Sequence, residues 1–131
     1  MVNNNFRKFT LDSGKEIIAG RDSEQNDLLV ENSKRNDVLL HTVQPGSSFV
    51  NLGEKPEKEE INEGSIFCAL KSQDFRDNQG NVKVNVFLKG DCFKDKEMKS
   101  GTWNVRKNSN TIKVNKIDIL RLQHEIENNR D

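Results

Sequence analysis

The residues of this chain that could do chemistry are few and far apart. His41 and His124 lie in different halves of the sequence, and Cys68 and Cys92 form no CxxC pair. HExxH, GxSxG and the GxxxxGK phosphate loop do not occur. We therefore expect no enzyme, no cofactor and no metal site, with the two cysteines buried as small apolar side chains.

Positive charge is concentrated in one part of a neutral chain. Lys and Arg number 21, as do Asp and Glu, but residues 82–121 hold ten basic and only four acidic side chains. A localised cationic segment suits a polyanion, although a solvated, strand-rich surface gives the same count. Trp103 could stack on a base there if it is exposed, or it could be buried. The cations that we consider nucleic-acid ligands are Lys89, Lys94, Lys96, Lys99, Arg106 and Lys107.

Three short motifs stand in order between residues 20 and 49. They read Gly20-Arg21-Asp22 followed by Gln25-Asn26-Asp27, then Asp37-Val38-Leu39-Leu40-His41, then Pro45-Gly46-Ser47-Ser48. In order and spacing they resemble the NFACT-R domain, the RNA-binding module of NFACT proteins. Residues 99–105 and 111–114 are similar to its closing segments, so the resemblance spans roughly residues 8–116.

Two positions depart from the family pattern. Aliphatic residues stand where an aromatic is expected after Asp37, and Ser48 stands where the family has a second histidine. The resemblance therefore implies no role that needs a pair of histidines.

The resemblance implies RNA-contacting roles for several motif residues. Arg21 would present a planar fork to a phosphate beside the free N–H groups of a helix start. Gln25 and Asn26 would hydrogen-bond ribose or base edges, with His41 and Ser47 nearby. His41 could instead be a buried structural residue oriented by Asp37. Structural roles remain for Gly20, Asp27, Asp37, Pro45 and Gly46.

Hydrophobic patterning predicts the elements that position these motifs. Turn-forming residues 12–15 between two apolar runs predict a first hairpin, and residues 38–43 and 49–52 around Pro45-Gly46 predict a second hairpin at the centre of the sheet. Alternating valines from Val82 predict another strand. Residues 102–105 and 111–114 predict a third hairpin, and residues 90–101 a basic loop.

Helices are expected at three places. Ser23 can cap a short helix over residues 24–31, residues 57–73 show the clearest helical pattern, and residues 117–127 offer a last helix with Ile119, Leu120 and Leu122 to bury. Gly64 inside the second helix indicates close packing against the sheet. Residues 74–81 are expected to be a loop.

These patterns predict one α+β domain over residues 1–131, with a largely antiparallel sheet and two or three helices, a core over about residues 8–116 and a C-terminal helix over about residues 117–129. Neither a long apolar run nor a leader-like segment is present, so we expect a cytoplasmic protein without membrane contact. We expect it to bind RNA, with tRNA or ribosomal RNA implied by the resemblance, in translation or ribosome-associated quality control. The ribosome is a further expected partner, and DNA stays open. The alternative is a protein-interaction module on a ribosome-associated partner without direct RNA contact.

Overall fold

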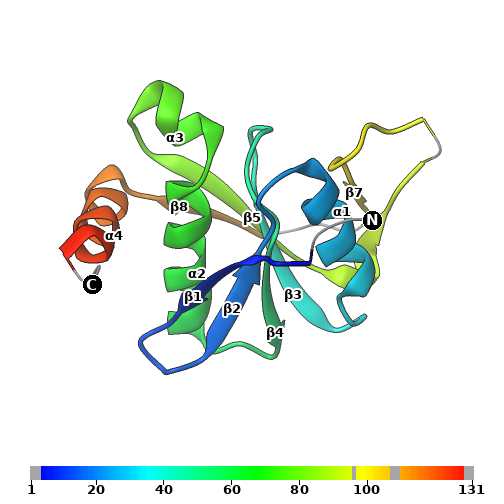
Figure 1. The fold of residues 1–131 in the computed structure, drawn as a ribbon, viewed down its shortest axis with the longest axis horizontal. Helices are drawn as coiled ribbons and strands as arrows, with labels where there is room; N and C mark the ends of the chain where they lie inside the picture. Colours follow the sequence, from blue (N-terminus) through cyan, green and yellow to red (C-terminus); the bar gives the residue numbers. More distant parts are fainter. Residues whose placement is uncertain (1–3, 96, 107–109, 129–131) are drawn as a thin grey trace.

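The computed structural model describes residues 4–95, 97–106 and 110–128. Its centre is a six-stranded sheet in the order β1-β2-β4-β3-β5-β8, in which every neighbouring pair is antiparallel (Figure 1). The strands are β1 (Arg7–Thr10), β2 (Glu16–Ala19), β3 (Asp37–Thr42), β4 (Val50–Glu54), β5 (Val82–Leu88) and β8 (Asn110–Val114). This α+β architecture confirms the predicted fold class, and both predicted N-terminal hairpins are present.

Helices cover both faces of the sheet. Helix α1 (Ser23–Asn32) lies on one face, which we call the α1 face, and α2 (Lys58–Leu70) and α4 (Lys116–Asn128) lie on the other (Figure 1). Alternation along β3 divides its side chains between two cores: Leu39 packs with Leu29, Phe49 and Phe87 under α1, whereas Leu40 packs under α2. None of the described helices is long and apolar enough to cross a membrane.

The helices differ in detail from the predictions. The cap of α1 is Asp22 rather than Ser23, because the Asp22 carboxylate accepts a hydrogen bond of 2.8 Å from the Gln25 amide. The long predicted second helix stops at Leu70, and Ser72 then caps a separate short helix, α3 (Gln73–Asn78), over residues expected to be largely a loop. The described residues therefore form four α-helices, one more than the upper number expected.

Gly64 lies where α2 crosses the sheet. A Cβ atom at this position would stand 2.7 Å from Leu52 Cδ2 and 3.2 Å from Leu40 Cδ1. This contact confirms the predicted close packing of α2 on the two central strands.

The predicted third hairpin is wrong. Strand β7 (Asn104–Val105) pairs with β6 (Cys92–Phe93) in a separate two-stranded sheet, whereas β8 pairs with β5. The short helix η1 (Lys89–Asp91) connects β5 to β6. Residues 92–95 and 97–105 therefore form an excursion from the main sheet that contacts α1, and β8 then pairs with β5 at the edge of that sheet.

Candidate nucleic-acid interface

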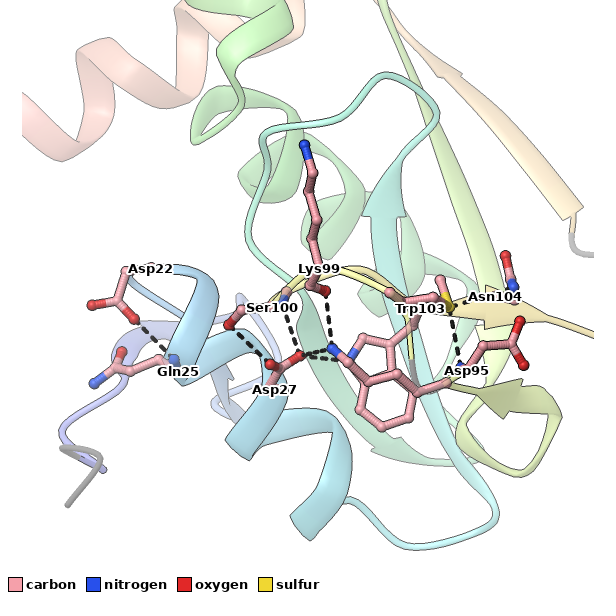
Figure 2. Close-up of polar contacts among 11 residues, drawn as sticks. Asp22, Gln25, Asp27, Asp95, Lys99, Ser100, Trp103 and Asn104 are labelled. Carbon is pink, nitrogen blue, oxygen red and sulfur yellow. Dashed lines mark hydrogen bonds and ion pairs between the residues drawn. The ribbon is translucent and has the colours of Figure 1, made fainter.

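Asp27 on α1 holds the excursion in place. Its carboxylate accepts hydrogen bonds from Lys94 Nζ at 2.7 Å, Trp103 Nε1 and the Gly101 amide at 2.9 Å each, and Ser100 Oγ at 3.0 Å. Figure 2 shows Asp27 facing Ser100 and Trp103, while the Lys99 side chain extends away from them. We call this four-donor cluster the Asp27 latch.

The latch fixes the charge and the orientation of its members. Burial opposes ionisation of Asp27, but the four donors outweigh it and lower the pKa of its carboxyl group. Lys94 is thus neutralised by an ion pair and also lies over the Trp103 ring, 5.1 Å from its centroid. Trp103 is half-buried and packs against the core under α1. These contacts are consistent with the structural role expected for Asp27. They join Asp27 to residues about seventy positions away in the sequence.

A pocket of about 310 Å³ lies beside the latch on the α1 face. It brings together segments that the sequence analysis singled out separately: His41 from β3, the Pro45-Gly46 turn and residues 101–103 of the excursion. Gly46 has a φ of +94°, in the region that glycine adopts without strain. Phe49 and Phe87 add two aromatic rings to the lining, and Asn85 of β5 adds a polar side chain.

His41 lines this pocket. Its Nδ1 lies 2.7 Å from the Thr42 carbonyl oxygen, and its ring lies 4.4 Å from the Phe49 ring, centroid to centroid. Burial lowers the pKa of His41, and the hydrogen bond to Thr42 only partly opposes this. Asp37 does not orient the ring: it accepts hydrogen bonds from the Lys34 amide and Asn51 Nδ2.

Several side chains expected to contact RNA are used inside the protein. Asn26 is buried. Its Nδ2 donates to the Ser47 carbonyl oxygen and its Oδ1 accepts from the Phe49 amide, so its polar atoms hold the segment just before β4 in place. Gln25 is also buried, and its Oε1 accepts from the Arg21 amide. Ser47 is buried and accepts from the Thr42 amide. This geometry favours structural roles for these three side chains.

Arg21 remains exposed at the start of α1. Its Nε donates to the Asn5 carbonyl oxygen at 2.8 Å. The adjoining helix start is less open to anions than expected, because the Asp22 carboxylate occupies the Gln25 amide and adds a negative charge. Gly20, just before Arg21, donates to Phe49 O and accepts from Ser48 Oγ.

Strand register shows which groups share one end of the sheet. Arg7 of β1 pairs with Ala19, the Gly20 amide bonds Phe49, and the Val43 amide bonds Lys83 O. The ends of β2 and β3 and the start of β5 therefore lie together. We call this end of the sheet the Arg21 end.

A group of cations at the Arg21 end was missed by the sequence analysis. Burial and repulsion from Arg21 and Arg76 lower the pKa of Arg7, and burial and repulsion from Arg7 lower that of Lys71. Arg7 Nε is buried without a hydrogen-bond partner among the described residues. No ion pair to a carboxylate is found for these cations in the part of the chain described. We call Arg7, Arg21, Lys71 and Arg76 the four-cation cluster.

Two further lysines lie on the uncovered part of the α1 face. Lys83 and Lys113 are exposed and occupy directly opposite positions on β5 and β8. Like charges in such a pair repel, so a bound anion would relieve the repulsion. The positive total of residues 82–121 signalled these lysines, but their pairing depends on the sheet.

The predicted basic segment is divided by the fold. Lys89 donates to the Ser33 carbonyl oxygen, and the Arg106 amide donates to Asp91 O, so both lie away from the Arg21 end. Arg106 also lies over the Phe93 ring, 5.0 Å from its centroid. Lys99 is exposed near the latch, whereas Lys96 and Lys107 lie outside the described residues. The structure does not bring Lys89 and Arg106 together with Arg21.

A larger cavity, of about 560 Å³, lies between β1, α2 and α4. It is lined by four carboxylates, Asp12, Glu63, Asp118 and Glu125, against two cations, Lys8 and Arg121. Burial and the neighbouring carboxylates raise the pKa of Glu63. This acidic lining is unsuited to a polyanion. Within the described ranges, no three His, Cys, Asp or Glu side chains gather as metal ligands would.

Comparison with known proteins gives a fold and a family. No curated protein matches the sequence. The chain is similar in structure to the C-terminal region of the fibronectin/fibrinogen-binding protein from Streptococcus suis, with a TM-score of 0.77 and 19% identity. That similarity covers 88% of this chain and 47% of the other, and it shows a shared fold. Residues 5–107 match the family described as the NFACT protein RNA binding domain. The match covers most of the sequence, and the chain therefore belongs to this family of RNA-binding domains.

Proposed function

We propose that this chain is an RNA-binding module that engages RNA at the Arg21 end of its sheet. The supporting observation is the four-cation cluster: its members come from four segments, Arg7 is repelled by Arg21, Arg76 and Lys71, and no member has a carboxylate partner among the described ion pairs. Phosphates would relieve this repulsion. Arginine forks also suit phosphate geometry.

The neighbouring surface extends this footprint. The backbone N–H of Gln73, in α3, donates to the Gly46 carbonyl oxygen. This bond joins α3 to the turn that borders the pocket. Lys83 and Lys113, paired across β5 and β8, add two exposed cations at the same end of the sheet. An RNA strand could therefore follow a path from the four-cation cluster, past the pocket, to the paired lysines.

The expected RNA class is tRNA or ribosomal RNA, and the expected setting is translation or ribosome-associated quality control in the cytoplasm. The expected RNA class and the setting in translation rest on the family. The proposed activity is binding rather than catalysis. The alternative, a module that binds a ribosome-associated protein without RNA contact, makes no use of the repelling cations.

Salt dependence tests this proposal. If about four phosphates are neutralised, the slope of log K against log[salt] should be about −3 to −4 for bulk tRNA. Fluorescence anisotropy over about 50–200 mM salt would measure it. Affinity that does not change with salt, or no binding to tRNA or ribosomal RNA, would contradict the proposal and favour the protein partner.

A further inference from the structure

The pocket on the α1 face has the size and lining of a small-ligand site. Its volume of about 310 Å³ is at the lower end of the range for ligand pockets. Four aromatic residues line it, His41, Phe49, Phe87 and Trp103. Flat aromatic ligands stack favourably on such side chains.

Two polar groups on neighbouring strands complement this aromatic lining. A carbonyl oxygen only accepts hydrogen bonds, so His41 Nδ1 donates to Thr42 O, and the neutral ring keeps an acceptor at Nε2. Asn85 Oδ1 accepts from Thr111 Oγ1 at 2.9 Å, and the Asn85 amide N–H groups have no partner among the described residues. His41 and Asn85 are directly paired across β3 and β5. The pocket thus offers an adjoining acceptor and donor.

One wall of the pocket is held in place before any ligand arrives. Trp103 cannot turn freely, because its Nε1 donates to Asp27, and residues 100 and 101 are bonded to the same carboxylate. Binding in a preformed site avoids the entropic cost of ordering its side chains.

We propose that this pocket receives a single unpaired nucleobase, which makes the domain a reader of single-stranded RNA segments rather than of duplex. A nucleobase combines a flat aromatic ring with adjoining donors and acceptors on its edge, as His41 Nε2 and Asn85 require. Lys83 is exposed and precedes Asn85 by two positions on β5, so a cation stands on the same face of the sheet as the pocket and can meet the attached phosphate. This inference rests on the proposed RNA-binding function.

The protein's own tryptophan provides the measurement. Trp103 is the only tryptophan of the chain, so its emission reports on this pocket alone. We would titrate the full chain with a short single-stranded RNA oligomer and with an abasic oligomer carrying the same number of phosphates. We expect the base-bearing oligomer to quench Trp103 and to bind about tenfold tighter or more. The abasic oligomer should bind weakly and leave the emission unchanged.

A pocket-filling variant gives a second test. Thr102 is exposed and lines the pocket, so Thr102→Phe should fill it without disturbing the core. We expect this variant to lose the preference for base-bearing RNA but to keep its salt slope. Thr10→Phe, on an exposed position beside the acidic cavity, is the matched control and should behave as the unchanged protein.

The outcomes separate this inference from the function on which it rests. If both oligomers bind equally, with salt-dependent affinity and no quenching, the nucleobase site is refuted and RNA binding stands. If Thr102→Phe keeps the full preference for bases, the pocket is likewise refuted. If neither oligomer nor bulk tRNA binds, both proposals are overturned.

Discussion

A single carboxylate on α1 organises the residues around the pocket. The Asp27 latch uses four donors, which is about the full acceptor capacity of a carboxylate. An amide in its place has one acceptor oxygen and brings two donors of its own. Lys94, Gly101 and Trp103 all donate to Oδ1, and an uncharged amide oxygen would hold these donors, above all the Lys94 ammonium, less strongly, while the Ser100 hydroxyl would lose its acceptor at Oδ2.

We therefore predict that Asp27→Asn loosens the excursion. The free energy of unfolding should fall by about 1–3 kcal/mol, since a charged hydrogen-bond acceptor is lost. Trp103 emission should shift to longer wavelength as its indole gains contact with water. Denaturant titration and fluorescence spectra would measure both, with Asp95→Asn, on an exposed carboxylate of the same excursion, as the control. An unchanged spectrum would show that the latch does not position Trp103.

His41 gives a prediction about pH. Its folded-state pKa lies below the ordinary value of about 6.5, so the unfolded chain binds the proton more readily. The stability that the neutral ring contributes is therefore fully present above about pH 6.5 and is lost as the pH falls through the lowered pKa. His41→Gln should remove this pH dependence and cost about 1–3 kcal/mol near neutral pH.

Unfolding titrations of the two proteins at several pH values would test this. The same shift bears on RNA affinity: a ring that resists protonation should give less tightening between about pH 7.5 and 6 than an ordinary histidine would. Marked tightening over that range, absent in His41→Gln, would instead show that the imidazolium contacts phosphate.

At the scale of elements, the closeness of α2 to the sheet depends on Gly64. Replacing a helical glycine with alanine normally adds about 1 kcal/mol of stability. Here the new methyl group would press on Leu52 and Leu40, which are both fully buried, and such overpacking typically costs about 1–3 kcal/mol. We predict that Gly64→Ala is net destabilising by about 1–2 kcal/mol. Thermal denaturation would test it, and a raised melting temperature would show that the core adjusts freely.

Local sequence signals predicted the elements that form from adjacent residues. The first two hairpins and the strand from Val82 follow from alternation and turn residues alone. The third hairpin failed because β7 and β8 each pair with strands that are distant in sequence. Helix α3 was missed because its short length gives no periodic pattern, although Ser72 is a normal capping residue. In the predicted third hairpin, tertiary pairing therefore overrode local propensity.

The same limit applies to the candidate site. Its motif residues Arg21, His41 and Pro45-Gly46, together with Trp103, were identified from the sequence. The Asp27 latch joins residues about seventy positions apart, and Arg7, Lys71 and Arg76 come from separate elements. No local pattern marks such groups, because only the fold brings them together.

At the scale of the whole molecule, cations from several sequence segments gather at one end of the sheet. The chain is neutral, but the four-cation cluster and the paired lysines belong to one end. Lys34 and Lys58 lie near the opposite end, where β3 begins and β4 finishes. This difference allows two double variants with the same change in net charge to be compared.

We predict that Arg21→Ala combined with Arg76→Ala reduces the salt slope of RNA binding by about 2, since each removed cation accounts for about one phosphate contact. Both side chains are exposed, so the fold should be kept. Lys34→Ala combined with Lys58→Ala should leave the slope unchanged, because neither cation lies on the proposed path. Anisotropy titrations would give the slopes, with melting temperatures measured alongside. The slopes decide whether RNA phosphates contact Arg21 and Arg76 or are attracted only by the net charge of the protein. Equal slopes for the two variants would mean that RNA responds only to net charge, and the Arg21 end would then not be the binding site.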